Sequence, residues 1–199
     1  MRLDILENGQ STIQKLQMGL IRKMMAGLLP GPVAALSYRA DFFGKAFNDA
    51  TQMALRNQTE WTKVEAELFA AFVSYNNRCQ FCYGAHSAIA VNGMDEKVVT
   101  AVMQNHQTAP VNERIRATLG FLEKLTKFPE AVTAVDMELM RAVEITDAAI
   151  EEVVQICFVF CTINRIADAF DFEIAEGKGR ERMGMMLYNL GYGIGSLPG

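Results

Sequence analysis

The sequence predicts an all-α, single-domain protein, and three observations support this fold class. Apolar residues recur at the spacing of amphipathic helices along most of the chain. No segment shows the strict alternation of a half-buried strand, and no hairpin signal joins two strand-like runs. The segment 153–163 is apolar and β-branched enough for a buried strand, but it has no second strand to pair with. Its length and its Ala and Asn content fit a buried helix.

The first sixty residues are predicted to form two helices. Residues 3–29 read as one amphipathic helix, which stops where Pro30, Gly31 and Pro32 force a turn. The next run, 32–56, keeps Leu, Phe and Met at helical spacing with Ala between them. We expect these side chains in the core or in a contact between subunits.

A boundary between two helices is predicted just after Tyr75. The apolar run that follows Trp61 ends there, and an Asn pair comes next. Asn77 is the expected N-cap of the new helix, because an Asn side chain accepts a hydrogen bond from an otherwise unpaired backbone N–H. The dipeptide Asn92-Gly93 is expected to close this helix.

Caps and prolines predict the remaining helices. They are a short helix capped by Asp95, a long one from Pro110 to Lys127, a short one over 136–143, and a long one over 148–170 capped by Thr146 and Asp147. The tail, 177–199, is rich in Gly and Met. Its Gly-x-Gly-x-Gly run does not follow a strand, so it is not a dinucleotide fingerprint. We expect the tail to pack against a neighbouring helix or subunit.

Composition and charge exclude several classes of protein. The net charge of −4 and the lack of a basic stripe argue against a nucleic-acid partner held by electrostatics. The first residues lack the basic start and apolar core of a signal peptide, and no apolar run approaches the roughly 18 residues of a membrane span. We therefore expect a cytoplasmic protein whose four cysteines are reduced, catalytic or buried.

The reactive side chains gather between residues 67 and 86. On one helix, Cys79, Cys82 and His86 would lie within roughly 60° of one another. The start of a helix stabilises a thiolate over a thiol, and His86, one turn beyond Cys82, can accept the proton. The two thiols can also close a disulfide. If the chain folds back at the Asn pair, the carboxylate of Glu67 reaches His86 or Cys79.

Other interpretations of this cluster stay open. Two small buried thiols near a surface His would give the same pattern, and two thiolates with one imidazole can bind zinc, with Glu67 or water as the fourth ligand. Glu65 competes with Glu67 but lies about 200° away around the helix. Cys157 and Cys161 fall in an apolar run and are expected to pack in the core. His106 is expected to be solvated at a helix end.

The spacing Glu67-x11-Cys79-x2-Cys82-x3-His86 resembles the active-site signature of the AhpD-like alkylhydroperoxidases, within the carboxymuconolactone decarboxylase superfamily. Later segments are also similar to helices of that family: 117–127, 145–148 and 164–169. The resemblance covers about residues 60 to 175. It divides the chain into an N-terminal helical extension packed on the core, an AhpD-like core, and a C-terminal tail, over 1–60, 61–175 and 176–199, as in the peroxidase-related branch.

The resemblance implies an all-helical homo-oligomer, a dimer or larger, that reduces hydroperoxides. Cys82 would be the peroxidatic nucleophile, Cys79 the resolving thiol, and His86 with Glu67 the proton relay. No cofactor is implied, so an external dithiol or a protein reductant must restore the thiols. Phe81 departs from the family because it replaces a second His. The relay then lacks one member, and a lower peroxidase rate or a different substrate is expected.

Two alternatives to a hydroperoxide reductase stay open. One is a thiol–disulfide oxidoreductase that acts on protein or lipoyl partners. The other is a non-catalytic oligomer that binds zinc or is purely structural. A ring-opening decarboxylase, the other activity in the superfamily name, is not expected, because those relatives generally lack the cysteine pair.

Overall fold

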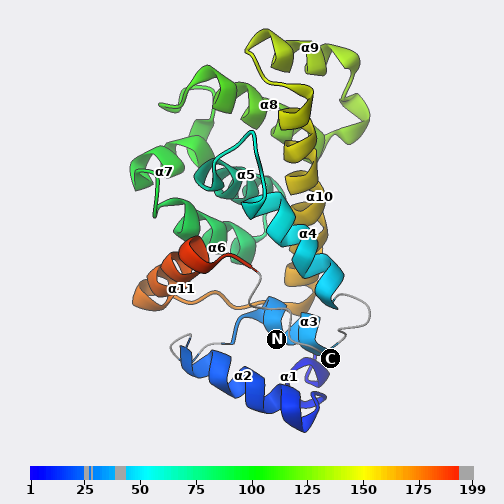
Figure 1. The fold of residues 1–199 in the computed structure, drawn as a ribbon, viewed down its shortest axis with the longest axis vertical. Helices are drawn as coiled ribbons and strands as arrows, with labels where there is room; N and C mark the ends of the chain where they lie inside the picture. Colours follow the sequence, from blue (N-terminus) through cyan, green and yellow to red (C-terminus); the bar gives the residue numbers. More distant parts are fainter. Residues whose placement is uncertain (25–26, 28, 39–43, 193–199) are drawn as a thin grey trace.

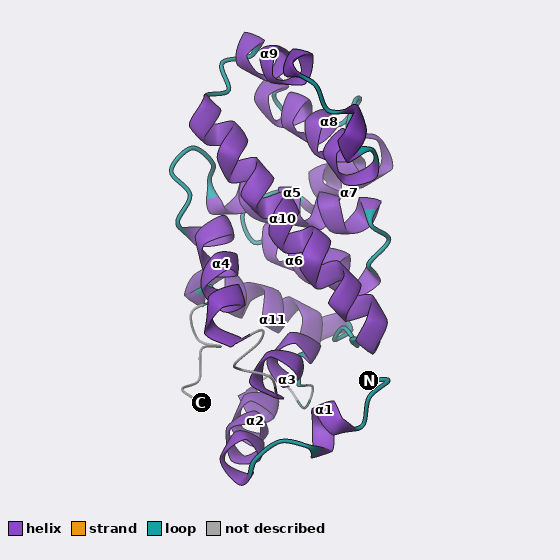
Figure 2. Cartoon of the chain, turned by 90° about the vertical axis from the view of Figure 1, so that its right-hand side faces the viewer, coloured by secondary structure: helices purple, strands orange, loops and turns teal. Residues whose placement is uncertain are grey.

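The computed structural model describes residues 1–24, 27, 29–38 and 44–192, and within these ranges the chain is helical and contains no strand (Figures 1 and 2). The predicted all-α class is therefore confirmed. The helices are α1 (Ile5–Asn8), α2 (Thr12–Met24), α3 (Gly31–Tyr38), α4 (Lys45–Arg56), α5 (Lys63–Asn76), α6 (Gln80–Ala90), α7 (Glu96–Asn105), α8 (Glu113–Lys127), the 3-10 helix η2 (Pro129–Ala131), α9 (Ala134–Ala142), α10 (Asp147–Phe170) and α11 (Gly177–Leu190).

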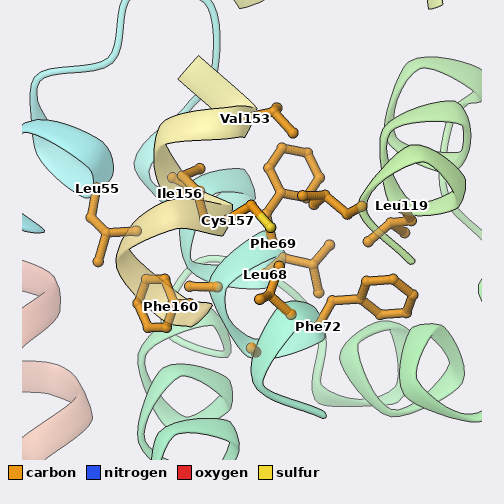
Figure 3. Close-up of a cluster of buried hydrophobic side chains, with 14 of the residues drawn as sticks. Leu55, Leu68, Phe69, Phe72, Leu119, Val153, Ile156, Cys157 and Phe160 are labelled. Atoms are coloured by element: carbon orange, nitrogen blue, oxygen red, sulfur yellow. The ribbon is translucent and has the colours of Figure 1, made fainter. Parts of the chain in front are cut away.

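Helix α5 forms the centre of the core. Every residue from 66 to 74 is buried, so this helix is covered on all sides rather than on one face. It packs against α4, α6, α7, α8 and α10. Figure 3 shows its Leu68, Phe69 and Phe72 packed among side chains of α10 and against Leu119. A helix buried in this way holds the side chains that it carries in fixed positions.

Helix α10 is the second central element. It is long and apolar enough to cross a membrane by length and composition alone, with a mean hydropathy of 1.5, so the expectation that no run approaches a membrane span was wrong. Core helices of globular proteins meet the same criterion, and 44% of the apolar stretch is buried inside the fold. Here it packs against α4, α5, α6, α8 and α9.

The N-terminal segment differs from the prediction. In place of one helix over 3–29, the structure has α1 and α2, and the side chain of Gln10 between them donates to the carbonyls of Leu6 and Ala34. The run 32–56 also gives two helices, α3 and α4, and residues 39–43 lie outside the described part of the chain. The helices α1, α2 and α3 lie at the end of the molecule opposite α9 (Figures 1 and 2).

Most of the predicted caps are confirmed. The side chains of Asp95 and Thr146 each accept a hydrogen bond from a backbone N–H in the first turn of α7 and α10. Asn112, which was not among the predicted caps, caps α8 in the same way. Asn77 is the exception. It ends α5, and α6 begins after Cys79, because Arg78 adopts a left-handed backbone with φ of +63°. A bulky residue with positive φ gives no turn signal in the sequence.

The C-terminal segment packs on α6, as expected of a tail that covers a neighbouring helix. Gly184 of α11 lies so close to α6 that a Cβ there would meet the carbonyl oxygen of Ala88 at 2.3 Å. The two backbones can approach this closely only without a side chain at that position. The last two glycines of the Gly-x-Gly-x-Gly run, at 193 and 195, lie outside the described residues.

Candidate active site

The helical hairpin of α5 and α6 brings Glu67 and His86 together. The Nδ1 atom of His86 lies 2.6 Å from Oε2 of Glu67, and both side chains are buried. The two residues are 19 positions apart and sit on consecutive helices. The expectation that the chain folds back and places this carboxylate on the imidazole is confirmed in its geometry.

Two residues that the sequence did not single out complete the surroundings of Glu67. The guanidinium of Arg56, at the end of α4, lies 2.6 Å from Oε1. The hydroxyl of Tyr192, which follows α11, donates to the same oxygen over 2.8 Å. The Arg56 guanidinium also lies over the Tyr192 ring, 4.9 Å from its centroid. No local pattern could reveal the Tyr192 contact, because Tyr192 is 125 positions from Glu67 in the chain.

The network keeps Glu67 ionised and fixes the tautomer of His86. Burial acts to raise the pKa of Glu67, but the contacts with His86, Arg56 and Tyr192 outweigh it and lower the pKa. Burial and the Glu67 charge raise the pKa of Tyr192, so its phenol remains a donor. An ionised Glu67 can only accept, so Nδ1 of His86 carries the hydrogen. The other ring nitrogen, Nε2, is then free to take a proton.

The two thiols lie at the start of α6. Cys79 is the N-cap residue and Cys82 falls in the first turn, and the two residues are only 0% and 2% exposed. A hydrogen bond with Cys79, together with burial, raises the pKa of Cys82 well above its usual value. The expectation of a stabilised thiolate is therefore wrong for Cys82, because loss of water and the second sulfur outweigh the helix terminus. Asn164 of α10 donates to Cys82 and partly opposes this shift.

His86 is adjacent to the pair in sequence but is not bonded to it. Among the described residues, no hydrogen bond joins the imidazole to either thiol. The ring instead packs edge-on against Phe160, with centroids 4.5 Å apart. A proton must therefore pass between sulfur and Nε2 through water or a bound molecule. Phe81, between the cysteines, packs edge-on against Phe172 with centroids 5.4 Å apart.

A cavity of about 380 Å³ lies on the neighbouring flank of α6, between α6, α7 and α11. Tyr83 and Ser87 line it, each one position after a residue of the site, together with Arg180 of α11. The Ser87 hydroxyl is buried there and has no hydrogen-bond partner among the described residues. Neither thiol lines this cavity.

The remaining predicted residues fall into separate places. Glu65 closes the capping box of α5 with Thr62, so it does not compete for His86. His106 is buried against Phe72, and burial lowers its pKa, so the expectation of a solvated residue is wrong. Within the described part of the chain, no group of three or more His, Cys, Asp or Glu side chains is placed to hold a metal ion. The zinc interpretation therefore has no geometric support.

Comparison with solved structures places this arrangement in a known class of fold, the helical AhpD core. One similar structure is an uncharacterized peroxidase-related protein from Silicibacter sp. TM1040, with a TM-score of 0.76 and 22% identity over 92% of this chain and 95% of that one. Another is described as an alkylhydroperoxidase AhpD core from Ralstonia eutropha JMP134, with a TM-score of 0.74 and 25% identity over the same shares.

A third similar structure is the debrominase Bmp8, solved as a Cys-to-Ala variant in complex with 2,3,4-tribromopyrrole. Its TM-score is 0.68, with 19% identity over 88% of this chain and 91% of that one. No family model and no curated protein matches the sequence. The predicted resemblance to AhpD-like proteins is thus confirmed in the fold, and neighbours with this fold include peroxidase-related proteins and a debrominase.

Proposed function

We propose that this protein is a thiol-dependent hydroperoxide reductase. The observation that carries the proposal is the buried 2.6 Å contact between Glu67 of α5 and His86 of α6, because α6 also carries Cys79 and Cys82 at its start. The raised pKa of Cys82 keeps this thiol protonated at neutral pH, so a base must remove its proton when substrate binds. His86, with Nδ1 held by Glu67, provides that base at Nε2.

The reaction then proceeds in two steps. The Cys82 sulfur, losing its proton to His86, attacks the terminal oxygen of ROOH; an S–O bond forms, the O–O bond breaks, and the alkoxide leaves as ROH with a proton from His86. The resulting sulfenic acid reacts with the Cys79 thiol, so that an S–S bond forms and water leaves. An external dithiol, small enough to reach the buried pair, reduces the disulfide by thiol–disulfide exchange. The proposal includes a homo-oligomer in the cytoplasm.

Burial of the thiols favours a small substrate. At 0% and 2% exposure, Cys79 and Cys82 are out of reach of a folded protein that presents a disulfide, whereas a small hydroperoxide needs only a narrow path. This observation ranks the thiol–disulfide oxidoreductase second. Burial hinders a small dithiol less than a folded protein, because only one of its sulfurs has to reach the disulfide at a time.

The test is hydroperoxide consumption by the reduced protein with an excess of dithiol. Cys82→Ser is expected to abolish turnover, and mass spectrometry of the oxidised wild type is expected to find a disulfide between Cys79 and Cys82. Cys157→Ser, in the second thiol pair, is the matched control and should retain activity. Unchanged consumption in Cys82→Ser would refute the proposal. The same assay with 2,3,4-tribromopyrrole in place of the hydroperoxide tests for the activity of the debrominase neighbour, and the proposal predicts no turnover of it.

A further inference from the structure

The second thiol pair, Cys157 and Cys161 on α10, has contacts beyond apolar core packing. The sulfurs of Cys157 and Cys161 lie 3.7 Å apart, one helical turn from each other. Cys157 is buried in the main core, as predicted, and Figure 3 shows it among the side chains of α5 and α10. Cys161 is partly buried and packs against the same core, so the expectation of core packing is confirmed for Cys157 and holds in part for Cys161.

The Cys161 sulfur has donors on several sides. The Cys157 thiol faces it, and Nδ2 of Asn77, from the end of α5, lies 3.5 Å away. Arg165, one turn further along α10, bonds the Cys161 carbonyl and is the charged group that acts on the thiol. Asp168, one turn beyond Arg165, acts on Cys82 instead. Cys161 thus faces donors and a positive charge, which is the setting that activates a thiol.

The proton of the pair belongs on Cys157. Cys157 is more buried, and within the described part of the chain its one further partner is the Thr126 hydroxyl, at 3.8 Å, so ionising it would be more costly. The hydrogen bond from Cys157, followed by those from Asn77 and Arg165, lowers the pKa of Cys161 to about 6 in spite of partial burial. The lowered pKa gives Cys161 a larger thiolate fraction at neutral pH than a free thiol has.

The surface around Cys161 indicates which molecules it meets. Phe158 and Val154 are 65% and 41% exposed and lie on the same stripe of α10, one and two turns before it. The exposed Arg165 lies one turn after Cys161 along α10, so Cys161 stands between the apolar residues and the guanidinium. An apolar strip that ends in a guanidinium suits a disulfide that carries carboxylates, because Arg binds a carboxylate through paired hydrogen bonds.

We propose that Cys161 is a second nucleophilic thiol of this protein, separate from the candidate active site, and that it forms mixed disulfides with small anionic disulfides. In the reaction the Cys161 thiolate attacks one sulfur of the disulfide; a new S–S bond forms, the original S–S bond breaks, and one thiolate leaves. The step needs no proton and no other oxidant. It does not depend on the hydroperoxide reductase activity, since it uses none of the residues of that site.

The first experiment measures the rate of iodoacetamide labelling of each cysteine of the reduced full-length protein, by peptide mass spectrometry at a series of pH values. Cys161 is expected to label first, at least about tenfold faster than the other thiols, with a midpoint well below the value of about 8.5 of a free thiol. Equal labelling of all four thiols, or a midpoint at that value, would overturn the proposal.

Two matched variants locate the cause. Cys157→Ala removes the thiol donor and is expected to slow Cys161 labelling several-fold near pH 6.5 and raise its midpoint, whereas Cys157→Ser keeps a donor and should restore most of the rate. If the two variants behave alike, Cys157 does not activate Cys161 and the proposed pair is wrong.

The second experiment tests the choice of anionic partners. Oxidised glutathione, which carries carboxylates, is compared with cystamine, which carries ammonium groups. The wild type is expected to form the Cys161 adduct several-fold faster with oxidised glutathione. Arg165→Gln should slow both reactions, because Arg165 also lowers the pKa of Cys161, but it should slow the oxidised glutathione reaction several-fold more and so remove the preference. A preference for cystamine, or one that survives Arg165→Gln, would contradict the assignment of Arg165.

Discussion

The two thiol pairs of this protein lie on neighbouring helices and differ in nearly every property except their residue type. Cys79 and Cys82 are buried at the start of α6, and the hydrogen bond between them raises the pKa of Cys82. Cys157 and Cys161 lie inside α10, and there the contact between the sulfurs, together with Asn77 and Arg165, lowers the pKa of Cys161. Close approach of two sulfurs therefore does not by itself activate a thiol.

What separates the pairs is the source of activation. The pair on α6 has an imidazole–carboxylate relay nearby, which removes a proton only when a molecule or water bridges the gap. The pair on α10 has fixed donors and a cation, which stabilise a thiolate in the resting protein. We therefore expect the first pair to react only when a bound molecule or water links Cys82 to His86. The second pair should react with thiol reagents in the resting protein.

The strongest test of this comparison is Glu67→Gln, which keeps the size of the side chain and removes its charge. Because buried Arg56 loses its partner, we expect a loss of roughly 3 kcal/mol in unfolding free energy. Hydroperoxide turnover should fall about 100-fold, since no carboxylate then orients His86 or stabilises the imidazolium that forms when it takes the proton. Cys161 labelling should not change.

Thermal denaturation, steady-state turnover and residue-resolved labelling measure these three effects. Glu65→Gln is the matched control, because it changes the same residue type on the same helix but lies in the capping box. It should cost about 1 kcal/mol and spare turnover. If Glu67→Gln keeps full turnover, the relay does not activate the first pair.

A second prediction concerns acid. The pKa of Glu67 is lowered in the folded chain, so its ionised form adds stability above the unfolded value of about 4.3. This contribution is lost as the pH falls through the lowered folded value. Urea unfolding from about pH 7 to about pH 3 should show the wild type and Glu67→Gln converging at the acid end. A constant gap between them at every pH would contradict this assignment.

Asn77→Ala tests whether the two pairs are independent. The Asn77 amide contacts the Cys161 sulfur and also donates to Oδ1 of Asn164, over 2.9 Å. Losing both contacts should cost about 1–2 kcal/mol. Cys161 labelling should slow several-fold, because one donor to the thiolate is gone, whereas hydroperoxide turnover should change much less. Equal effects on both would mean that Asn77 and Asn164 couple the pairs.

The smallest effect is expected from Tyr192→Phe. The ring can keep its place against Arg56, and only the hydroxyl that donates to Glu67 is lost. We expect a cost of about 1 kcal/mol and a several-fold loss of turnover, with the Cys161 rate unchanged. Differential scanning calorimetry and steady-state kinetics measure these effects. A loss as large as that of Glu67→Gln would show that the phenol does more than support the carboxylate.

Local signals in the sequence could predict much of this fold. Helix periodicity, the caps at Asp95 and Thr146 and the stop before Pro129 are properties of neighbouring residues, and the structure confirms them. Helix α6 starts later than predicted, after Cys79 instead of Asn77, because Arg78 adopts a positive φ that its residue type does not indicate. The spacing of Glu67 and His86 could predict their contact, because their helices are consecutive and only one turn separates them.

The rest of the site depends on contacts between distant segments. Arg56 and Tyr192 reach Glu67 from α4 and from the segment after α11, and no spacing rule connects them. The pKa of Cys82 depends on its hydrogen bond with Cys79 and on burial, and that of Cys161 on Cys157 and also on Asn77, 84 positions away. A short motif identifies which groups are present, but the surrounding fold decides their protonation.

The close fit of Gly184 on Ala88 has a consequence for the order in which the protein becomes active. Until α11 has docked on α6, the phenol of Tyr192 has no fixed route to the carboxylate. Contacts between segments this far apart in the chain are slow to form, because the long loop between them must close first. An immature chain would then hold its first cysteine pair near a Glu67 carboxylate that still lacks its Tyr192 donor.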